Sequence, residues 1–173
     1  MRRARGFTLL ELIVVVAAVA LLAGVALNRL LPLVGRAQRA AFLQVQNELK
    51  SALLLEAAER ITRGESHTLP DLAAQNPMAL LLEPPANYVG AVRRVDDAAI
   101  PRASWYYDER QGHLAYRVGR HTRSDAQGGP RDLIELEVAF VYQDRDADGM
   151  FDAAGDRFDG LRLTPVHAYK WPD

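Results

Sequence analysis

The residues best suited to chemistry form an acidic run near the C-terminal end of the chain. Carboxylates stand at its first, third and fifth positions and glycine at the sixth. Alternate side chains of such a loop point at one centre and the glycine permits a sharp turn, which is the pattern of a Ca²⁺-binding loop. The seventh position would give its backbone carbonyl. The candidate Ca²⁺ ligands are Asp144, Asp146, Asp148, Met150, Asp152 and Asp156.

The acidic run departs from an EF-hand at its last position. Position 12 is Gly155, where an EF-hand has a bidentate glutamate, and Asp156 comes one residue late. No flanking helices are expected, so the run is predicted to be a loop between two strands. A solvated acidic turn is the alternative, because aspartate and glycine are favoured in turns. The six aspartates of residues 144–159 repel one another without a cation, which supports the metal site.

A second group with chemical potential is a single carboxylate inside an apolar run. Residues 7–27 are 21 in number, and only Thr8 and Glu11 among them are polar. A helix of that length spans a hydrocarbon layer of ~30 Å at ~1.5 Å per residue. Because a carboxylate in a membrane is costly, Glu11 is expected to have a partner and a task. Three arginines in the first five residues predict a cytoplasmic N-terminus.

The residues before and around this carboxylate follow a specific pattern. Residues 6–12 read GFTLLEL, directly after the short basic segment. This segment resembles the class III leader of type IV pilins and type II secretion pseudopilins. The resemblance implies that a prepilin peptidase cuts between Gly6 and Phe7 and methylates the new N-terminal Phe7. It also implies that Glu11, the fifth mature residue, pairs with a phenylalanine amine during assembly, so that each buried charge relieves the other.

The resemblance implies a structural subunit, a pseudopilin or minor pilin, of a type II secretion pseudopilus or a type IV pilus. Its partners would be the prepilin peptidase, other pilin or pseudopilin subunits and the inner-membrane assembly platform. The chain would cross the bacterial inner membrane once, with its globular domain in the periplasm, before it enters the filament. The choice between secretion pseudopilus and surface pilus, and between major and minor subunit, is left open.

Two other interpretations of the N-terminus are possible. The tripeptide at residues 18–20, AVA, offers the small-residue site of a secretory signal, which would free a secreted protein after Ala20. An uncut chain would instead be a single-pass, membrane-anchored calcium-binding module that does not polymerise. Neither alternative explains why Gly6, Phe7 and Glu11 stand in register.

Composition restricts the class of protein further. The chain has 173 residues, enough for one domain plus a long anchor helix, and no cysteines, so packing or a metal must replace disulfides. Without the three leader arginines, 18 basic residues face 22 acidic ones, a net charge of −4 that makes nucleic-acid binding unlikely. One basic cluster offers a weak DNA contact, and a solvated loop is the favoured interpretation. The cluster comprises Arg117, Arg120, His121 and Arg123.

The sequence offers no motif of an enzyme. Its four histidines lack metal-ligand spacing, and neither a cysteine nucleophile nor a G-x-S-x-G elbow is present. The chain is therefore predicted not to be an enzyme.

Apolar spacing predicts the element that carries Glu11. Apolar residues recur at spacings of three and four after the membrane run, so an amphipathic helix should run to about Arg60 and pack on its own globular domain. Joined to the membrane run it makes a helix of ~80 Å at ~1.5 Å per residue. Pro32 is expected to kink or open this helix. The stripe comprises Phe42, Val45, Leu49, Ala52 and Leu53.

Strands follow the helix in the second half of the chain. Asn76 and Pro77 open a predicted short helix through Leu82, and residues 84–101 are predicted to be an irregular connector. Alternating and β-prone stretches predict strands at residues 104–107, 113–118, 133–142 and 161–171, the last one broken at Pro165, with a Gly-rich loop at residues 124–130.

The elements together predict an α+β, pilin-like fold. A long N-terminal α-helix, transmembrane in its first half and amphipathic in its second, packs on a small C-terminal antiparallel β-sheet of three or four strands. The expected divisions are a cleaved basic leader (1–6), a transmembrane and assembly helix (7–27), its amphipathic continuation (28–62) and a globular periplasmic domain (63–173).

Overall fold

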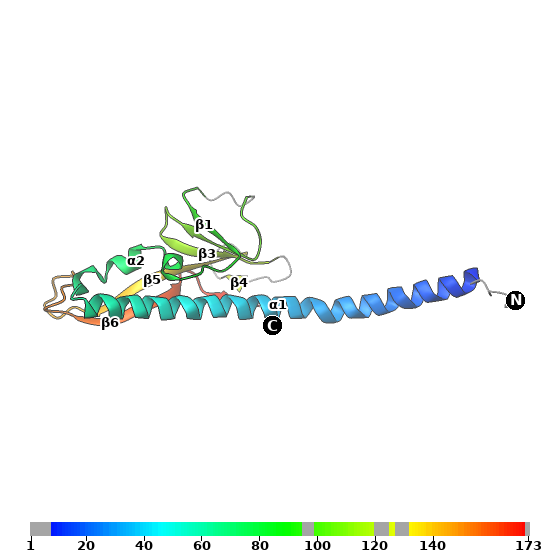
Figure 1. Cartoon of the computed structure of the whole chain (residues 1–173), viewed down its shortest axis with the longest axis horizontal. Helices are drawn as coiled ribbons and strands as arrows, with labels where there is room; N and C mark the ends of the chain where they lie inside the picture. Colours follow the sequence, from blue (N-terminus) through cyan, green and yellow to red (C-terminus); the bar gives the residue numbers. More distant parts are fainter. Residues whose placement is uncertain (1–7, 95–98, 120–124, 127–131, 172–173) are drawn as a thin grey trace.

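One long helix organises the molecule. The computed structural model describes residues 8–94, 99–119, 125–126 and 132–171. Helix α1 (Leu9–Thr62) runs the full length of the molecule, and the strands and short helices gather against its C-terminal half (Figure 1). Its N-terminal half extends from the rest of the chain without any other element beside it (Figure 1).

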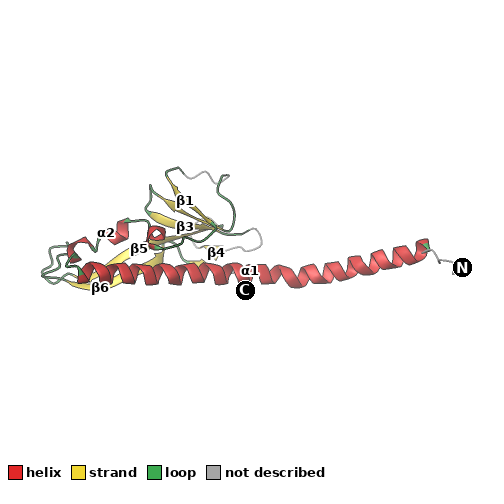
Figure 2. Ribbon diagram, in the orientation of Figure 1, coloured by secondary structure: helices red, strands yellow, loops and turns green. Residues whose placement is uncertain are grey.

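Helix α1 has no break, which corrects one expectation. It continues through Pro32 as a single helix of 54 residues and bends only gently (Figure 2). The helix does not open at Pro32, because a proline removes only one backbone donor and the hydrogen-bond ladder continues on both sides of it. The membrane half and the amphipathic half therefore form one continuous rod.

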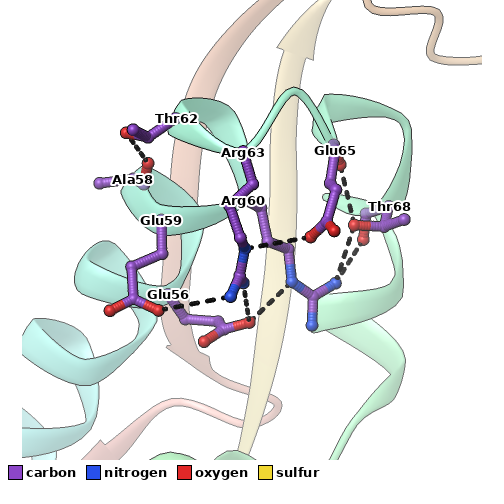
Figure 3. A network of polar contacts seen from close by, with 8 residues as sticks. All are labelled: Glu56, Ala58, Glu59, Arg60, Thr62, Arg63, Glu65 and Thr68. Atoms are coloured by element: carbon purple, nitrogen blue, oxygen red, sulfur yellow. Dashed lines mark hydrogen bonds and ion pairs between the residues drawn. The ribbon is translucent and has the colours of Figure 1, made fainter.

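The end of α1 is fixed by its backbone and by charged side chains. Gly64 has φ 78°, and its N–H donates to the carbonyl of Ile61 while the N–H of Glu65 donates to that of Arg60, which makes a Schellman motif. The Arg60 side chain joins this end to the next turn, with Nε 2.8 Å from Glu56 Oε1 and Nη1 2.7 Å from the Thr68 carbonyl (Figure 3). The chain therefore turns back against its own helix at this point.

Three short helical segments follow the turn. They are η1 (Ser66–Thr68), α2 (Asp71–Ala74) and η2 (Pro77–Leu80). Asn76 caps η2 as predicted, because its side chain accepts a hydrogen bond from the N–H of Met78 at 3.1 Å. The element is a 3₁₀ helix and ends two residues before the predicted end at Leu82.

The main sheet has five strands in the order β1-β2-β3-β5-β6. They are β1 (Tyr88–Val92), β2 (Ser104–Asp108), β3 (His113–Arg117), β5 (Leu133–Gln143) and β6 (Arg157–Pro165). All neighbouring pairs are antiparallel except β1 and β2, which are parallel. The predicted α+β layout of a long helix and a mostly antiparallel sheet is confirmed, with one strand more than expected.

Two predicted irregular segments contain strands. Strand β1 lies inside the expected connector. Its central residue, Gly90, has φ 116° and no side chain, so the alternating pattern that indicates a strand is interrupted there. Strand β4 (Asp125–Ala126) lies in the expected Gly-rich loop and pairs with β7 (Tyr169–Lys170). The predicted last strand is thus two strands, because β6 ends at Pro165 and β7 joins a separate small sheet.

The core lies between the C-terminal half of α1 and one face of the main sheet. Phe42 stacks on Trp105 with ring centroids 5.0 Å apart, and Tyr116 and Trp171 pack around this pair. Four of the five residues of the predicted stripe are at most 8 % exposed, so the stripe packs on its own globular part as expected. The buried members are Phe42, Val45, Leu49 and Leu53.

Candidate functional site

The described part of the N-terminal segment begins at the cap of α1. Gly6 and Phe7, the predicted cleavage residues, lie outside the described residues. Thr8 is the N-cap, and its Oγ1 accepts a hydrogen bond from the N–H of Glu11 at 3.2 Å. Glu11 is therefore the third residue of the first turn. The spacing of Thr8 and Glu11 is the sequence signature of a capping box, which indicates a helix start at Leu9.

The surroundings of Glu11 are apolar and uncovered. Residues Leu9–Ala26 form a helix long and apolar enough to cross a membrane, with a mean hydropathy of 2.8 and none of the segment buried. The large apolar side chains of this segment are 47–76 % exposed. Glu11 is the one charged side chain among residues 8–26, and a carboxylate in a first turn is favoured by the helix dipole. No described residue covers this half of α1.

The C-terminal half of α1 also has an uncovered face. Leu43, Leu54 and Leu55 are 41 %, 70 % and 63 % exposed, although they lie on the same helical segment as the buried stripe. These side chains belong to the helix face that the sheet leaves uncovered. The helix thus carries apolar side chains on the outside along both of its halves.

The predicted Ca²⁺ loop joins β5 and β6, as the sequence indicated. The carboxylate of Asp144 accepts hydrogen bonds from the N–H groups of Ala147 at 2.7 Å and Gly149 at 2.9 Å. Ala147 and Gly149 have φ 61° and 78°, and this turned backbone aims their N–H groups at the carboxylate. Phe151 fixes the loop to the sheet, with its ring 5.0 Å from that of Phe140.

Three of the predicted carboxylates converge. One oxygen each of Asp144, Asp146 and Asp156 lie within 4.8 Å of one another. Asp148 and Asp152 lie outside this group and bind the loop backbone, with Asp148 Oδ1 2.7 Å from the Met150 nitrogen and Asp152 Oδ1 near the nitrogens of residues 154 and 155. Carboxylate oxygens are the donors that Ca²⁺ prefers, so the converging residues fit such an ion.

The electrostatics of the loop separate two of its carboxylates. The N–H groups of Gly149 and Ala147 lower the pKa of Asp144, and the N–H of Gly149 has the larger effect. Desolvation acts to raise this pKa but is outweighed. The N–H of Asp148 acts to lower the pKa of Asp146, but desolvation and the neighbouring carboxylates outweigh it and raise that pKa. A cation between these groups would relieve the repulsion that raises the pKa of Asp146.

The basic cluster is only partly described. Arg117 donates from its side chain to the carbonyl of Ile100 and so serves the fold. Arg120, His121 and Arg123 lie outside the described residues. The weak DNA contact remains a prediction that no described residue supports.

Comparison with known families addresses the N-terminus. Residues 1–27 match the family model described as the prokaryotic N-terminal methylation motif, which is the class III prepilin-type signal of type IV pilins and pseudopilins. No curated protein and no solved structure matches the chain. The predicted resemblance is confirmed, and the matched residues include Gly6, Phe7 and Glu11. The motif is typical of prepilin-peptidase substrates of the pilin and pseudopilin type, and it indicates a structural protein.

Proposed function

We propose that this chain is a structural subunit, a pseudopilin or minor pilin, of a type II secretion pseudopilus or a type IV pilus. The observation that carries the proposal is the N-terminal half of α1. It carries the methylation motif, it is long enough to cross a bilayer, and nothing in the described chain covers it. Such a helix has two natural environments, the membrane before assembly and a bundle of similar helices afterwards.

The proposed maturation starts in the bacterial inner membrane. The leader arginines hold the N-terminus in the cytoplasm, and the globular part lies in the periplasm. The prepilin peptidase cuts between Gly6 and Phe7 and methylates Phe7. The assembly platform then moves the processed subunit from the membrane into the filament.

Glu11 gives the register of assembly in this proposal. Its carboxylate lies in the first turn of α1, among side chains that are all apolar apart from Thr8. The amine of Phe7 from a neighbouring subunit would neutralise it, because an amine and a carboxylate buried together cost less than either one alone. The exposed Leu43, Leu54 and Leu55 support a helix bundle that extends beyond the membrane half.

The first test is the intact mass of the membrane-extracted protein from cells with and without a prepilin peptidase. Loss of residues 1–6 plus one methyl group, only when the peptidase is present, is the expected result. A mass that starts after Ala20 would identify a secreted protein and contradict the proposal. An uncut mass in both strains would identify an anchored module and contradict it equally.

The second test changes Glu11→Val in the full chain. The variant should be cut and methylated normally but should yield few sedimentable fibres, whereas an anchored module would tolerate the change. Val15→Ala is the matched control, because it alters the same apolar segment without a charge. Normal fibre yield from the Glu11→Val variant would contradict the role of Glu11.

We also propose that the loop between β5 and β6 binds Ca²⁺. Asp144, Asp146 and Asp156 would hold the ion, which supplies positive charge where three carboxylates converge. Metal binding to the folded state alone adds to stability, so chelator should lower the Tm of the globular part and added Ca²⁺ should restore it. A Tm that responds to neither would remove the site from the proposal.

A further inference from the structure

The acidic loop carries an unusual apolar side chain. Outside α1, the described residues expose only three large apolar side chains, Leu82, Val89 and Met150, and Met150 is 69 % exposed. Met150 lies midway along the loop between β5 and β6, flanked two residues away on each side by the exposed Asp148 and Asp152. The loop therefore presents a thioether between two carboxylates, an arrangement we term the Met150 tip.

A groove of complementary composition lies between α1 and the C-terminal segment. It encloses about 510 Å³, and its lining includes Arg39, Leu43, Pro165, Tyr169, Lys170 and Trp171. Arg39 and Lys170 are exposed, and neither forms an ion pair within the described ranges. The indole Nε1 of Trp171 is buried and has no hydrogen-bond partner among the described residues. The C-terminal groove thus combines aromatic and aliphatic walls with two cations.

The Met150 tip and the C-terminal groove lie beside different parts of α1, at different positions along its axis. Phe151, next to Met150, packs on the cluster that contains Ala57, whereas the groove contains Arg39 and Leu43. Ala57 is 14 residues beyond Leu43 and 18 beyond Arg39, which is about 20–30 Å at ~1.5 Å per residue. In Figure 1 the turn between β5 and β6 lies at the C-terminal end of α1, while β4, the partner of β7, lies near its middle.

We propose that the Met150 tip of one copy inserts into the C-terminal groove of a second copy displaced along the direction of α1. This contact rests on the proposed filament function and names one of its subunit interfaces. The thioether of Met150 would pack on the partly exposed ring of Tyr169, a contact that sulfur favours. Asp148 and Asp152 would face the cations Arg39 and Lys170 at the rim of the groove.

A second copy suits these surfaces because each copy carries both of them. Tip and groove are different surfaces, so their contact is heterologous, and a heterologous contact between copies displaced along one axis does not close into a dimer. It propagates into an open chain of subunits. The contact is also compatible with metal binding, since the converging carboxylates are Asp144, Asp146 and Asp156, which leaves Asp148 and Asp152 for the partner.

The absence of cysteines makes a direct cross-linking test possible. The full-length chain with Met150→Cys and Ala168→Cys, expressed with the prepilin peptidase and mildly oxidised, should give a ladder of dimers, trimers and longer species. Ala168 lines the same groove and is exposed. The matched control, Leu82→Cys with Ala168→Cys, places the first cysteine on another exposed apolar position and should give no ladder.

The outcomes separate this contact from the filament function itself. Fibres that sediment but give no ladder from the Met150→Cys and Ala168→Cys pair would overturn the contact and leave the filament function intact. A processed chain that forms no fibres at all would overturn both. A ladder from the Leu82 control as strong as that from the Met150 pair would also overturn the contact, because it would show unspecific collision.

Charge variants test whether the groove receives this tip or something else. Lys170→Glu and Met150→Ser should each reduce the fibre yield about tenfold while cleavage after Gly6 remains normal. Asp148→Lys should partly restore fibres in the Lys170→Glu chain, because the attraction is reversed in sign. A loss with Lys170→Glu alone, and none with Met150→Ser, would point to another occupant, such as an anionic lipid surface, and overturn the proposal.

Discussion

The two halves of α1 have the same backbone and opposite relations to the rest of the chain. In the C-terminal half, Phe42, Leu49 and Leu53 are at most 1 % exposed against the sheet. In the N-terminal half, Leu9–Ala26, none of the segment is buried, although it is the more apolar of the two. Apolar content alone therefore does not tell where a helix finds its partner.

The difference shows how one helix can serve folding and assembly separately. Full burial of a leucine-sized side chain is worth about 1.5–3 kcal/mol, so the stripe of the C-terminal half holds the globular part together. The N-terminal half gains no such burial from the described residues, and in the proposed function a membrane or other helices supply it. Substitutions in the N-terminal half should accordingly leave the stability of the globular part unchanged.

The largest expected effect comes from two leucines of the same helix. Leu49→Ala should lower the free energy of unfolding of the globular part by about 2–5 kcal/mol, because Leu49 is fully buried. Leu54→Ala should change it by less than about 0.5 kcal/mol, because Leu54 is 70 % exposed. Denaturant unfolding of the full chain in detergent micelles, followed by tryptophan fluorescence, measures both. Equal losses would contradict the assignment of the two faces.

The complementary change belongs to the N-terminal half. Val16→Arg should raise the cost of membrane insertion by about 2.5–3.5 kcal/mol and release the chain from membranes, while the Tm of the globular part stays the same. Leu54→Arg places the same charge on the exposed face of the other half and should leave membrane retention unchanged. The fraction of protein that sediments with carbonate-washed membranes measures the effect. Retention of the Val16→Arg chain would show that this half does not act as the anchor.

Local chemistry made much of this fold predictable. The end of α1 near Arg60, the cap at Asn76 and the break at Pro165 all follow from residues that act on their own neighbours in sequence. Strand β1 was not predictable in the same way, because Gly90 interrupts its alternation and its parallel pairing with β2 requires the chain to cross over between the two strands. The helix likewise continues through Pro32 because of the backbone hydrogen bonds on both sides of it, although proline itself disfavours the interior of a helix.

In the candidate sites too, features that are local in sequence were predicted and features that depend on the folded chain were not. The motif around Glu11 and the position of the acidic loop are contiguous in sequence, and both were predicted. Asp144, Asp146 and Asp156 converge because the backbone turns at Ala147 and Gly149. The spacing of the aspartates in the sequence does not predict this conformation. The C-terminal groove was not predicted at all, because α1 and β7 meet there only after folding.

A smaller effect is expected from two glycines, Gly64 just beyond the end of α1 and Gly24 inside it. Gly64 ends the helix with φ 78°, and Gly64→Ala should cost about 1–2 kcal/mol through backbone strain alone, since a Cβ there meets open space. Gly24 lies within the helix, also with open space, and Gly24→Ala should not destabilise the globular part. The difference in Tm between the two variants measures the strain. An equal Tm would contradict the left-handed conformation at Gly64.

The smallest effect concerns two carboxylates of the acidic loop, Asp144 and Asp146, which form no ion pair with a described residue. The pKa of Asp144 is lowered, so its stabilising contribution is present above its unfolded pKa and is lost as the pH falls through its folded value. The pKa of Asp146 is raised, so the folded state is favoured below its unfolded pKa, and that advantage is lost as the pH rises through its folded value.

Asn substitutions at these two positions should therefore act in opposite directions at neutral pH without metal. Asp146→Asn should raise the Tm slightly in chelator, because it removes a repelled charge, and Asp144→Asn should lower it, because it weakens the bonds from Ala147 and Gly149. With Ca²⁺ both variants should gain less than the unaltered chain, since each lacks one ligand charge. The Tm advantage of the Asp146→Asn variant over the unaltered chain should therefore shrink when Ca²⁺ replaces the chelator. An equal Tm advantage in both conditions would show that no ion uses this carboxylate.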